Sequence, residues 1–459
     1  MNITKTSLAL ALACAMGTSA FAQQQPTESP LAAAEGAKTV ELLKQLIRID
    51  TSNAPGDTTA LANFLKTQFA PLGADITIVT APNGKASHFI ARIKGDGSKK
   101  PILLAAHADV VPVERDRWTV EPFAGVEKDG FVFGRGAMDF KGGMAVFARA
   151  VMRLAEQKVP LSRDVIFLAE ADEEQGAFNT SWLAKDHWDK IDAEFALNEG
   201  GYVMQDEKGI VRQVNITTAD KVTMVLRLRT KGPVGHPSRP LPPSQTAGGK
   251  MIAALGKLSN YDTKIKLMPQ AGKEQALSSA KPSGASRLHA LTHDTMTITM
   301  FNSGKTANVI PGEAEAIVDV RMLPGTTTDQ IIEEVKGVIG DASVSVEIAS
   351  PASVEATQKY YRMRTSMPAS STSTDLYKAI EVNAKKLWPQ ADVVPALFEA
   401  GTDAIAWRER GVPVYGIYPY PLDDDILRGM HGHDERISVR SLHQGTDWIY
   451  KVLKDVAGK

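Results

Sequence analysis

The sequence predicts an α/β fold, in which a doubly wound, mostly parallel sheet forms a large domain and a smaller α+β lid domain is inserted into it. Short apolar runs of strand length alternate with segments of helical periodicity, as in parallel sheets. His and carboxylate residues follow several of these runs, at the sheet edge where ligands bind in α/β folds. The chain has 459 residues, more than one typical core contains.

The composition is that of an ordinary soluble globular protein. Lys and Arg total 52 against 53 acidic residues. No basic stripe suggests a nucleic-acid partner, and no acidic tail suggests a disordered segment that binds a partner. The single cysteine, Cys14, lies near the N-terminus, so disulfides and thiol catalysis are excluded for the rest of the chain. We expect no membrane span, because no later segment stays apolar for the ~20 residues that one needs.

The first 22 residues have the features of a secretory signal peptide. Lys5 supplies the positive start, residues 8–16 form an apolar core, and Ala-Phe-Ala at 20–22 is a small-x-small cleavage site. We therefore expect cleavage after Ala22 and a secreted or periplasmic protein. Residues 23–36 are rich in Gln, Pro, Ser and Ala and predict a flexible leader.

The large domain is expected to comprise residues 37–218 and 353–459. Helical spacing is expected at 40–47, 61–69, 142–157 and from Asp375, which Thr374 should cap. Strand-length apolar runs stand at 76–79, 88–93, 101–106, 165–169, 195–197 and 414–418.

The lid domain is expected at 219–352, where the pattern changes to strands with one wet face. Its expected elements are strands at 222–228, 295–301, 313–322 and 344–348 and helices at 245–258 and 329–339. The order strand, helix, two strands, helix, strand predicts a four-stranded sheet with two helices.

Groups that bind metals follow three of the predicted strands. One strand ends in His107 and Asp109, another in the acidic stretch 170–174, and a third in Glu199. Because clustered acids repel one another, a cation should lie among them, and the histidine favours a divalent metal. Taken singly, each group has a simpler explanation. His107 could stand at an ordinary strand-to-loop junction, and Asp139 could cap the helix that follows it.

Eight motifs together resemble a known family. They are His-Ala-Asp-Val-Val-Pro at 107–112, Gly-Arg-Gly-Ala-Met-Asp-Phe-Lys at 134–141, Asp-Glu-Glu at 172–174, Asn-Glu-Gly-Gly at 198–201, Asn-Val-Ile-Pro at 308–311, Asp-Val-Arg at 319–321, Gly-Thr-Asp at 401–403 and His-Gly-x-x-Glu-Arg-Ile at 431–437. In this order they resemble the zinc co-catalytic metallopeptidases and amidohydrolases that include glutamate carboxypeptidase, aminoacylase and succinyl-diaminopimelate desuccinylase. Within this family, the run Tyr418-Pro419 leading toward His431 makes the chain most similar to the branch of carboxypeptidase S and secreted N-acyl-amino-acid hydrolases.

The resemblance implies two Zn²⁺ ions, with Co²⁺ or Mn²⁺ as possible substitutes. His107, Asp139 and Glu199 would hold one ion, and Asp139, Glu174 and His431 the other, so that Asp139 bridges the pair. The chemistry agrees, because imidazole and carboxylate ligands suit zinc. Co-catalytic ions ~3.5–4 Å apart are also within reach of one bridging carboxylate.

The resemblance also implies how hydrolysis would proceed. A metal-bridged water would be the nucleophile and Glu173 the general base, whereas the simpler explanation for Glu173 is a solvated acid in a charged loop. Asp109 would orient His107. The Asp139–Phe140 peptide should be cis.

For substrate binding, the resemblance implies that Arg321 pairs with a carboxylate, although a surface ion pair is a comparable explanation. Asn308, Gly401 and Thr402 would also contact the substrate. His236 would stabilise the oxyanion across a possible homodimer formed through the lid.

Two motifs depart from the family pattern. Pro237 follows His236 where small residues are usual. Asp434 stands where Asn is common, and His433 adds a second imidazole that could compete as a ligand.

The expected function is that of a secreted dinuclear zinc hydrolase, a carboxypeptidase-type exopeptidase that cleaves an amide bond next to a free α-carboxylate. Small peptides and N-acyl-amino acids both fit as substrates, so an N-acyl-amino-acid amidohydrolase is the alternative. A catalytically silent binding protein on the same scaffold, and a hydrolase of other amides for which Arg321 is dispensable, are further alternatives.

Overall fold

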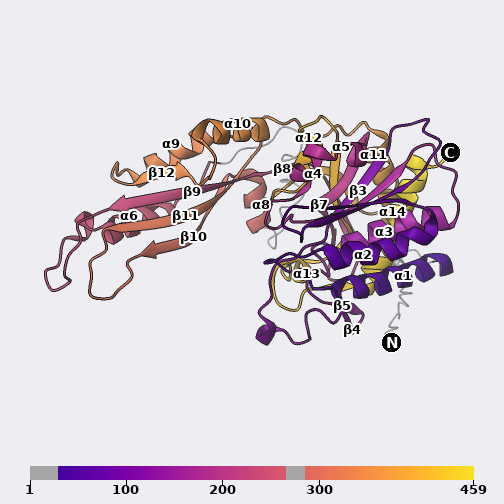
Figure 1. The fold of residues 1–459 in the computed structure, drawn as a ribbon, viewed down its shortest axis with the longest axis horizontal. Coiled ribbons are helices and arrows are strands. Elements are labelled where there is room, and N and C mark those ends of the chain that lie inside the picture. The colour runs from indigo at the N-terminus through magenta and orange to yellow at the C-terminus, as the bar shows by residue number, and fades with distance from the viewer. Residues whose placement is uncertain (1–28, 265–284) are drawn as a thin grey trace, which may run out of the picture.

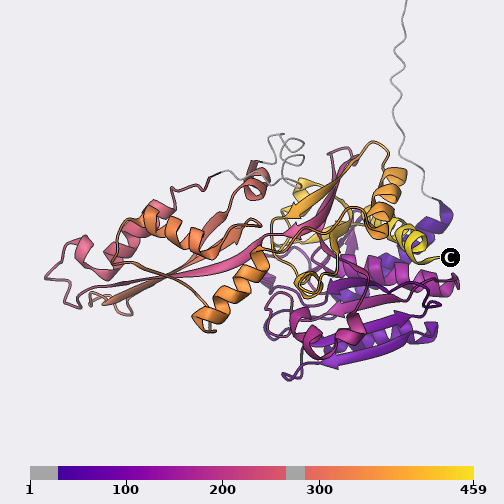
Figure 2. The same cartoon turned by 90° about the horizontal axis from the view of Figure 1, so that it is seen from above.

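The computed structural model describes residues 29–264 and 285–459, so the predicted signal peptide and residues 23–28 of the leader lie outside the described residues. Figure 1 shows an α/β body and an elongated lid that projects from one side of it, and Figure 2 shows the same separation from above. Among the described residues, no helix is both long and apolar enough to cross a membrane.

An eight-stranded sheet forms the centre of the large domain. Its strands are β1 (Asp75–Thr80), β2 (Ser87–Ile93), β3 (Ile102–His107), β6 (Val165–Glu170), β7 (Phe195–Gln205), β8 (Val211–Asp220), β13 (Asp392–Phe398) and β14 (Val414–Leu422). Their order is β1-β2-β6-β3-β7-β14-β8-β13. The central strands β6, β3, β7 and β14 are parallel, and β1, β2 and β8 join with antiparallel pairing. The predicted fold class is confirmed.

Helices cover both faces of this sheet. One face carries α1 (Pro30–Ile47), α2 (Thr59–Phe69), α3 (Lys141–Glu156), α11 (Asp375–Leu387) and α14 (Val439–Ala457), and the other carries α4 (Thr180–Asp186), α5 (Trp188–Ile191) and α12 (Ile405–Arg408). The central position of β3 explains why its sequence is apolar almost throughout. Leu104 packs into the first core and its neighbour Leu103 into the second, so both faces of the strand are buried.

Shorter elements complete the large domain. They are a three-stranded sheet of β4 (Val126–Lys128), β5 (Phe131–Phe133) and β15 (Arg436–Ser438), the helix α13 (Asp424–Leu427), and 3-10 turns at Ala70–Leu72 and Arg115–Arg117.

The expected flexible leader is wrong for its second half, because α1 begins at Pro30. Ser29 accepts a hydrogen bond from the Ala32 amide at 3.2 Å and so caps the helix, and proline is favoured at the first helical position. Further along, the Glu35 carboxylate lies 2.9 Å from the Arg149 guanidinium on α3. This tertiary contact fixes the first turns of α1. The composition of the segment gives no sign of it.

The expected end of a strand at 195–197 is also wrong, because β7 continues to Gln205 and forms a hairpin with β8. Asn198 pairs with Gly416 and Gly201 with Ile417, so Glu199 and Gly200 bulge out of the ladder. A Cβ atom on Gly200 would lie 2.3 Å from the Thr217 hydroxyl, so only glycine fits there. The Asn-Glu-Gly-Gly motif marks a bulge in a long strand.

The lid is a four-stranded antiparallel sheet with the order β10-β11-β9-β12, which agrees with the predicted module. Its strands are β9 (Val222–Lys231), β10 (Thr295–Ser303), β11 (Glu313–Met322) and β12 (Ser345–Ile348). Its helices are α6 (Ala247–Leu258), α8 (Ala285–Thr292), α9 (Thr328–Ile339) and α10 (Val354–Thr365), with a 3-10 turn at Pro243–Gln245. Two of them, α8 and α10, were not expected, and α10 packs against the lid core through Tyr361 although it lies past the expected boundary at 352. Only Lys221 separates β8 from β9, so the lid continues directly from the large sheet.

Candidate metal centre

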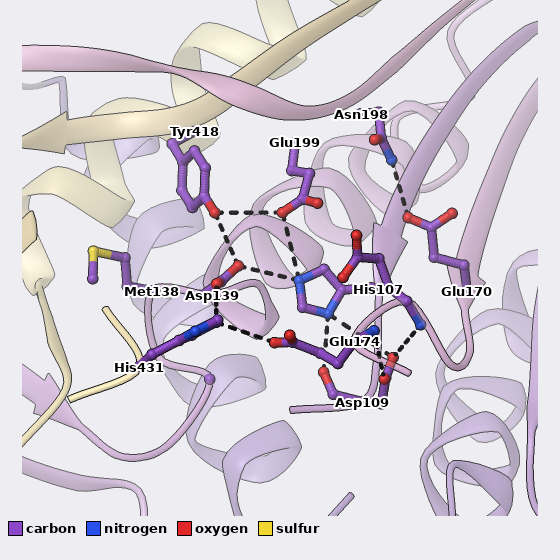
Figure 3. Close-up of polar contacts among 12 residues, drawn as sticks. His107, Asp109, Met138, Asp139, Glu170, Glu174, Asn198, Glu199, Tyr418 and His431 are labelled. Carbon is purple, nitrogen blue, oxygen red and sulfur yellow. Dashed lines mark hydrogen bonds and ion pairs between the residues drawn. The ribbon is translucent and has the colours of Figure 1, made fainter. Parts of the chain in front are cut away.

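The site lies where the central strands end. His107 is the last residue of β3, Glu174 lies in the loop after β6, and Glu199 stands in the bulge of β7. Asp139 immediately precedes Phe140, the N-cap residue of α3, and His431 follows α13. Figure 3 shows these five side chains converging on one point.

The Asp139 carboxylate lies between two imidazoles. Its Oδ1 atom is 3.1 Å from Nε2 of His107, and its Oδ2 atom is 3.0 Å from Nε2 of His431. Each imidazole faces one more carboxylate, since Glu199 lies 3.5 Å from His107 and Glu174 lies 3.3 Å from His431. The structure therefore brings the five predicted ligands together as two half-sites that share Asp139.

The electrostatics of the cluster favour a bound cation. Burial alone would lower the pKa of His107, but Glu199 and Asp139 outweigh it and raise that pKa well above its usual value. Asp139 and Glu174 raise the pKa of His431 to about 10. Burial raises the pKa of Glu199 to about 7, although His107 opposes this shift. The carboxylates thus favour positive charge between themselves and the imidazoles, and mixed imidazole and carboxylate donors are those that suit zinc.

Asp109 supports the centre through two different groups. Its main-chain carbonyl oxygen lies 2.9 Å from Nδ1 of His107, which leaves Nε2 available to bind a metal. Its carboxylate accepts hydrogen bonds from the amides of Glu173 and Glu174, both at 3.1 Å, and from the Asn53 side chain at 2.7 Å. The orienting contact to His107 thus comes from the carbonyl, and the carboxylate positions the Glu173–Glu174 loop.

Glu173 lies close to the half-site of His107. One of its carboxylate oxygens, a ring nitrogen of His107 and an oxygen of Glu199 all lie within 4.8 Å of one another. Burial raises the pKa of Glu173 well above its usual value, and the charge of Glu199 adds to this. A carboxyl group with a raised pKa beside a ligand cluster has the properties of a general base, although the same position would also allow it to be a ligand.

Glu435 has a role that the sequence did not indicate. It is fully buried and accepts hydrogen bonds from Arg135 at 2.6 Å and from the amides of Gly136, Met138 and Asp139 at 3.0, 2.8 and 3.0 Å. These contacts fix the backbone that carries the Asp139 carboxylate. Glu435 stands in the motif at 431–437, but nothing in that motif shows that it faces residues 135–139.

Tyr418 was noted in the sequence only as a feature of one branch of the family. Its buried hydroxyl lies 2.9 Å from Oδ1 of Asp139 and 3.3 Å from Oε2 of Glu199 (Figure 3). It is placed to donate a hydrogen bond to either ligand and to limit their rotation.

Two expectations about Asp139 are settled by the backbone. The Asp139–Phe140 peptide is cis, as the resemblance implied. The N-cap residue of α3 is Phe140, without a side-chain capping bond, so Asp139 does not cap this helix.

Three predicted substrate-binding residues lie at the root of the lid. Arg321 donates hydrogen bonds to the Asp319 carboxylate at 2.7 and 3.3 Å and to the Thr223 hydroxyl at 2.9 Å. A Cβ atom on Gly401 would lie 3.5 Å from that same hydroxyl. Thr402 is buried and donates its hydroxyl to Asp220 at 2.7 Å, so its side chain is directed into the protein.

The other two predicted lid residues, His236 and Asn308, lie at the opposite end of the lid. Their exposed loops follow β9 and precede β11, and the Ile310 amide donates to the Gly235 carbonyl at 2.7 Å. Since β9 has 10 residues, its two ends are roughly 33 Å apart. Within one chain, the structure does not bring these two residues to the cluster. His433 is exposed and belongs to neither half-site.

His88 is fully buried behind the loop at 171–178. Its Nε2–H donates to the Phe178 carbonyl at 2.8 Å, and its Nδ1 accepts from the Ala171 amide at 3.1 Å. This tautomer is neutral, and burial lowers the pKa of His88 to about 4.

His88 should therefore make the folded protein sensitive to acid. Between pH 6.5 and about pH 4, His88 binds a proton in the unfolded chain but not in the folded one. We expect about 3 kcal/mol of unfolding free energy to be lost over this interval. In His88→Gln, the same acidification should cost about 3 kcal/mol less, as measured by denaturant unfolding at several pH values. Parallel curves for the two proteins would contradict this account of His88.

Comparison with known proteins identifies the family. Residues 103–455 match the model of peptidase family M20/M25/M40. "Probable carboxypeptidase S-like 2" of Dictyostelium discoideum is 30% identical over 394 residues, which cover 78% of this chain and 72% of that protein. The N-fatty-acyl-amino acid synthase/hydrolase PM20D1 of Mus musculus is 27% identical over 458 residues, covering 90% of this chain and 87% of that protein.

A solved structure has the same fold. The M20 family metallo-carboxypeptidase Sso-CP2 from Sulfolobus solfataricus superposes with a TM-score of 0.69 at 18% identity, covering 91% of this chain and 98% of that one. The extent of the family match decides the assignment. The chain belongs to peptidase family M20/M25/M40, which confirms the resemblance of its motifs and the expectation that it is a metallopeptidase or amidohydrolase.

Proposed function

We propose that the protein is a secreted dinuclear zinc hydrolase that cleaves an amide bond next to a free α-carboxylate, in the manner of a carboxypeptidase. One observation supports this most directly. The two oxygens of Asp139 each face a different imidazole, and each imidazole has a further carboxylate beside it. This is the donor arrangement that two neighbouring cations require.

His107, Asp139 and Glu199 would hold one ion, and Asp139, Glu174 and His431 the other. When bound, the two ions would acidify a water molecule and polarise the scissile carbonyl. Glu173 would accept the proton of the attacking water and deliver it to the leaving nitrogen as the C–N bond breaks. Asp109 keeps the Nε2 lone pair of His107 directed at the site, because its carbonyl oxygen holds the proton on Nδ1.

The lid root and the relatives support the proposed substrate class. Arg321 is the group that would pair with a substrate carboxylate, with main-chain donors of Gly401 and Thr402 nearby. The Dictyostelium relative is named a carboxypeptidase and the mouse relative an N-fatty-acyl-amino acid synthase/hydrolase. Peptides and N-acyl-amino acids both present an amide next to a carboxylate, so an N-acyl-amino-acid amidohydrolase is the second candidate. Export rests on the signal features of residues 1–22.

A substrate panel tests this proposal. The chain from Gln23 onward should hydrolyse dipeptides or N-acyl-amino acids, lose activity on treatment with a chelator, and regain it with Zn²⁺ or Co²⁺. Substrates whose carboxylate is converted to an amide should react much more slowly. Arg321→Met should remove most of this preference. A chelator-resistant enzyme, or one indifferent to the carboxylate, would overturn the proposal.

A further inference from the structure

A second group of metal-binding side chains lies away from the catalytic cluster. Asp262, His289 and His293 each offer one ligand atom, and the three atoms lie within 4.8 Å of one another. Nε2 of His289 is already 3.2 Å from Oδ1 of Asp262. Ligands of a tetrahedral zinc ion at 2.0–2.1 Å are about 3.3 Å apart, so this pair has the required spacing.

The two histidines are held on one side of a helix. They are four positions apart, and the His293 amide donates to the His289 carbonyl at 3.0 Å, so the helical turn of α8 continues through His293. Their rings stack with centroids 4.0 Å apart. His289 is partly exposed, so its ring can rotate toward a shared ion, whereas His293 is only 8% exposed and is fixed.

The environment of His293 determines which of its two ring nitrogens carries the lone pair. Its Nδ1 lies 3.1 Å from the His289 carbonyl oxygen and 2.9 Å from the Thr292 hydroxyl. The carbonyl can only accept, so Nδ1 carries the proton and Nε2 carries the lone pair. A main-chain carbonyl that fixes the tautomer in this way is the usual support of a metal-binding histidine.

The group lies at the junction of lid and large domain, where Figure 1 shows α8. Lys221, the single residue between β8 and β9, donates to the carbonyls of Ala290 and His293 at 2.8 and 2.7 Å. Leu291 packs against Leu323 and Leu397, which belong to the connection after β11 and to β13. An interaction that fixes the position of α8 therefore also fixes the root of the lid.

We propose that Asp262, His289 and His293 form a site for a third transition-metal ion, separate from the catalytic pair. Two imidazoles and one carboxylate suit Zn²⁺, with a water molecule as the fourth ligand, and Cu²⁺ would bind more tightly to the same donors. The bound ion fastens α8 to the chain after α6. It shares no residue with the catalytic cluster, so it is a structural ion of the lid root.

Metal analysis of the full mature chain tests this site. After zinc loading and dialysis against a buffer of low free Zn²⁺, we expect three ions per wild-type chain and two per chain in His289→Ala and in His293→Ala. His187→Gln, which changes a histidine outside both groups, should keep three. Equal zinc content in wild type and both variants would overturn the proposal. If the wild type holds one ion that both variants lose, the third site stands and the dinuclear proposal fails.

A second measurement removes the effect of misfolding. Micromolar Zn²⁺ added to chains that already hold the catalytic ions should raise the melting temperature of the wild type but not of His289→Ala, because ligands stabilise only the state that binds them. His289 is partly exposed, so its replacement leaves the core intact. Equal shifts in both proteins would count against the site.

Discussion

Replacing Glu173 by glutamine should leave both catalytic metal ions bound and lower kcat by about 10²–10⁴-fold. Glutamine has the same size as glutamate and keeps the main-chain N–H that donates to Asp109. Its side chain cannot accept a proton from the attacking water. The measurement is metal content and turnover on the same preparation, with KM determined separately. A fall in kcat at unchanged KM is expected, because the base acts only as the water attacks.

The neighbouring glutamate provides a matched control. Glu174 faces His431 at 3.3 Å, so Glu174→Gln should weaken or remove the ion of that half-site. Glu173 also lies close enough to His107 and Glu199 to act as a ligand, and the pair of variants separates the two roles. If Glu173→Gln loses an ion as Glu174→Gln does, Glu173 is a ligand. If it keeps both ions and full activity, the base is a different residue.

The fold was predictable where one segment determines its own structure. The apolar runs of β3 and β6 and the alternating pattern of β9 identify buried and half-buried strands directly, and Thr374 does cap α11 through the Tyr377 amide. The errors occur where distant contacts decide. The first turns of α1 depend on Arg149, and β7 passes through its bulge because Thr217 and Gly416 approach Gly200 closely.

The site divides in the same way. Its five candidate ligands could be named because they stand in motifs whose order is distinctive, and the cis peptide at Asp139 came with that resemblance. The roles of Glu435 and Tyr418 at the site could not be predicted. Glu435 contacts Arg135 across 300 positions and Tyr418 contacts Asp139 across 279, and no local pattern encodes such pairings. Oxyanion stabilisation by His236 across a dimer and substrate binding by Asn308 both stay predictions.

Replacing Asp139 should give the second large effect, because each of its two carboxylate oxygens lies beside a different imidazole. In Asp139→Asn the side chain keeps one oxygen and gains an NH₂ group, which cannot bind a cation. We expect at most one ion to remain under conditions where the wild type holds two catalytic ions, and hydrolysis to fall by about 10³-fold or more, because polarisation of the carbonyl and activation of water both depend on the pair. Metal analysis and steady-state kinetics measure the two losses.

Asp206→Asn makes the same chemical change at a turn between β7 and β8, where asparagine can accept the same bonds from the amides of Lys208 and Ile210. This control should keep its metal ions and its activity. Asp139→Asn should also remain folded, because Glu435 still binds the amides of Gly136 and Met138 and the Arg135 side chain. A folded Asp139→Asn protein with both catalytic ions and wild-type turnover would show that Asp139 does not bridge the pair, and the distances from its carboxylate to His107 and His431 would then need another explanation.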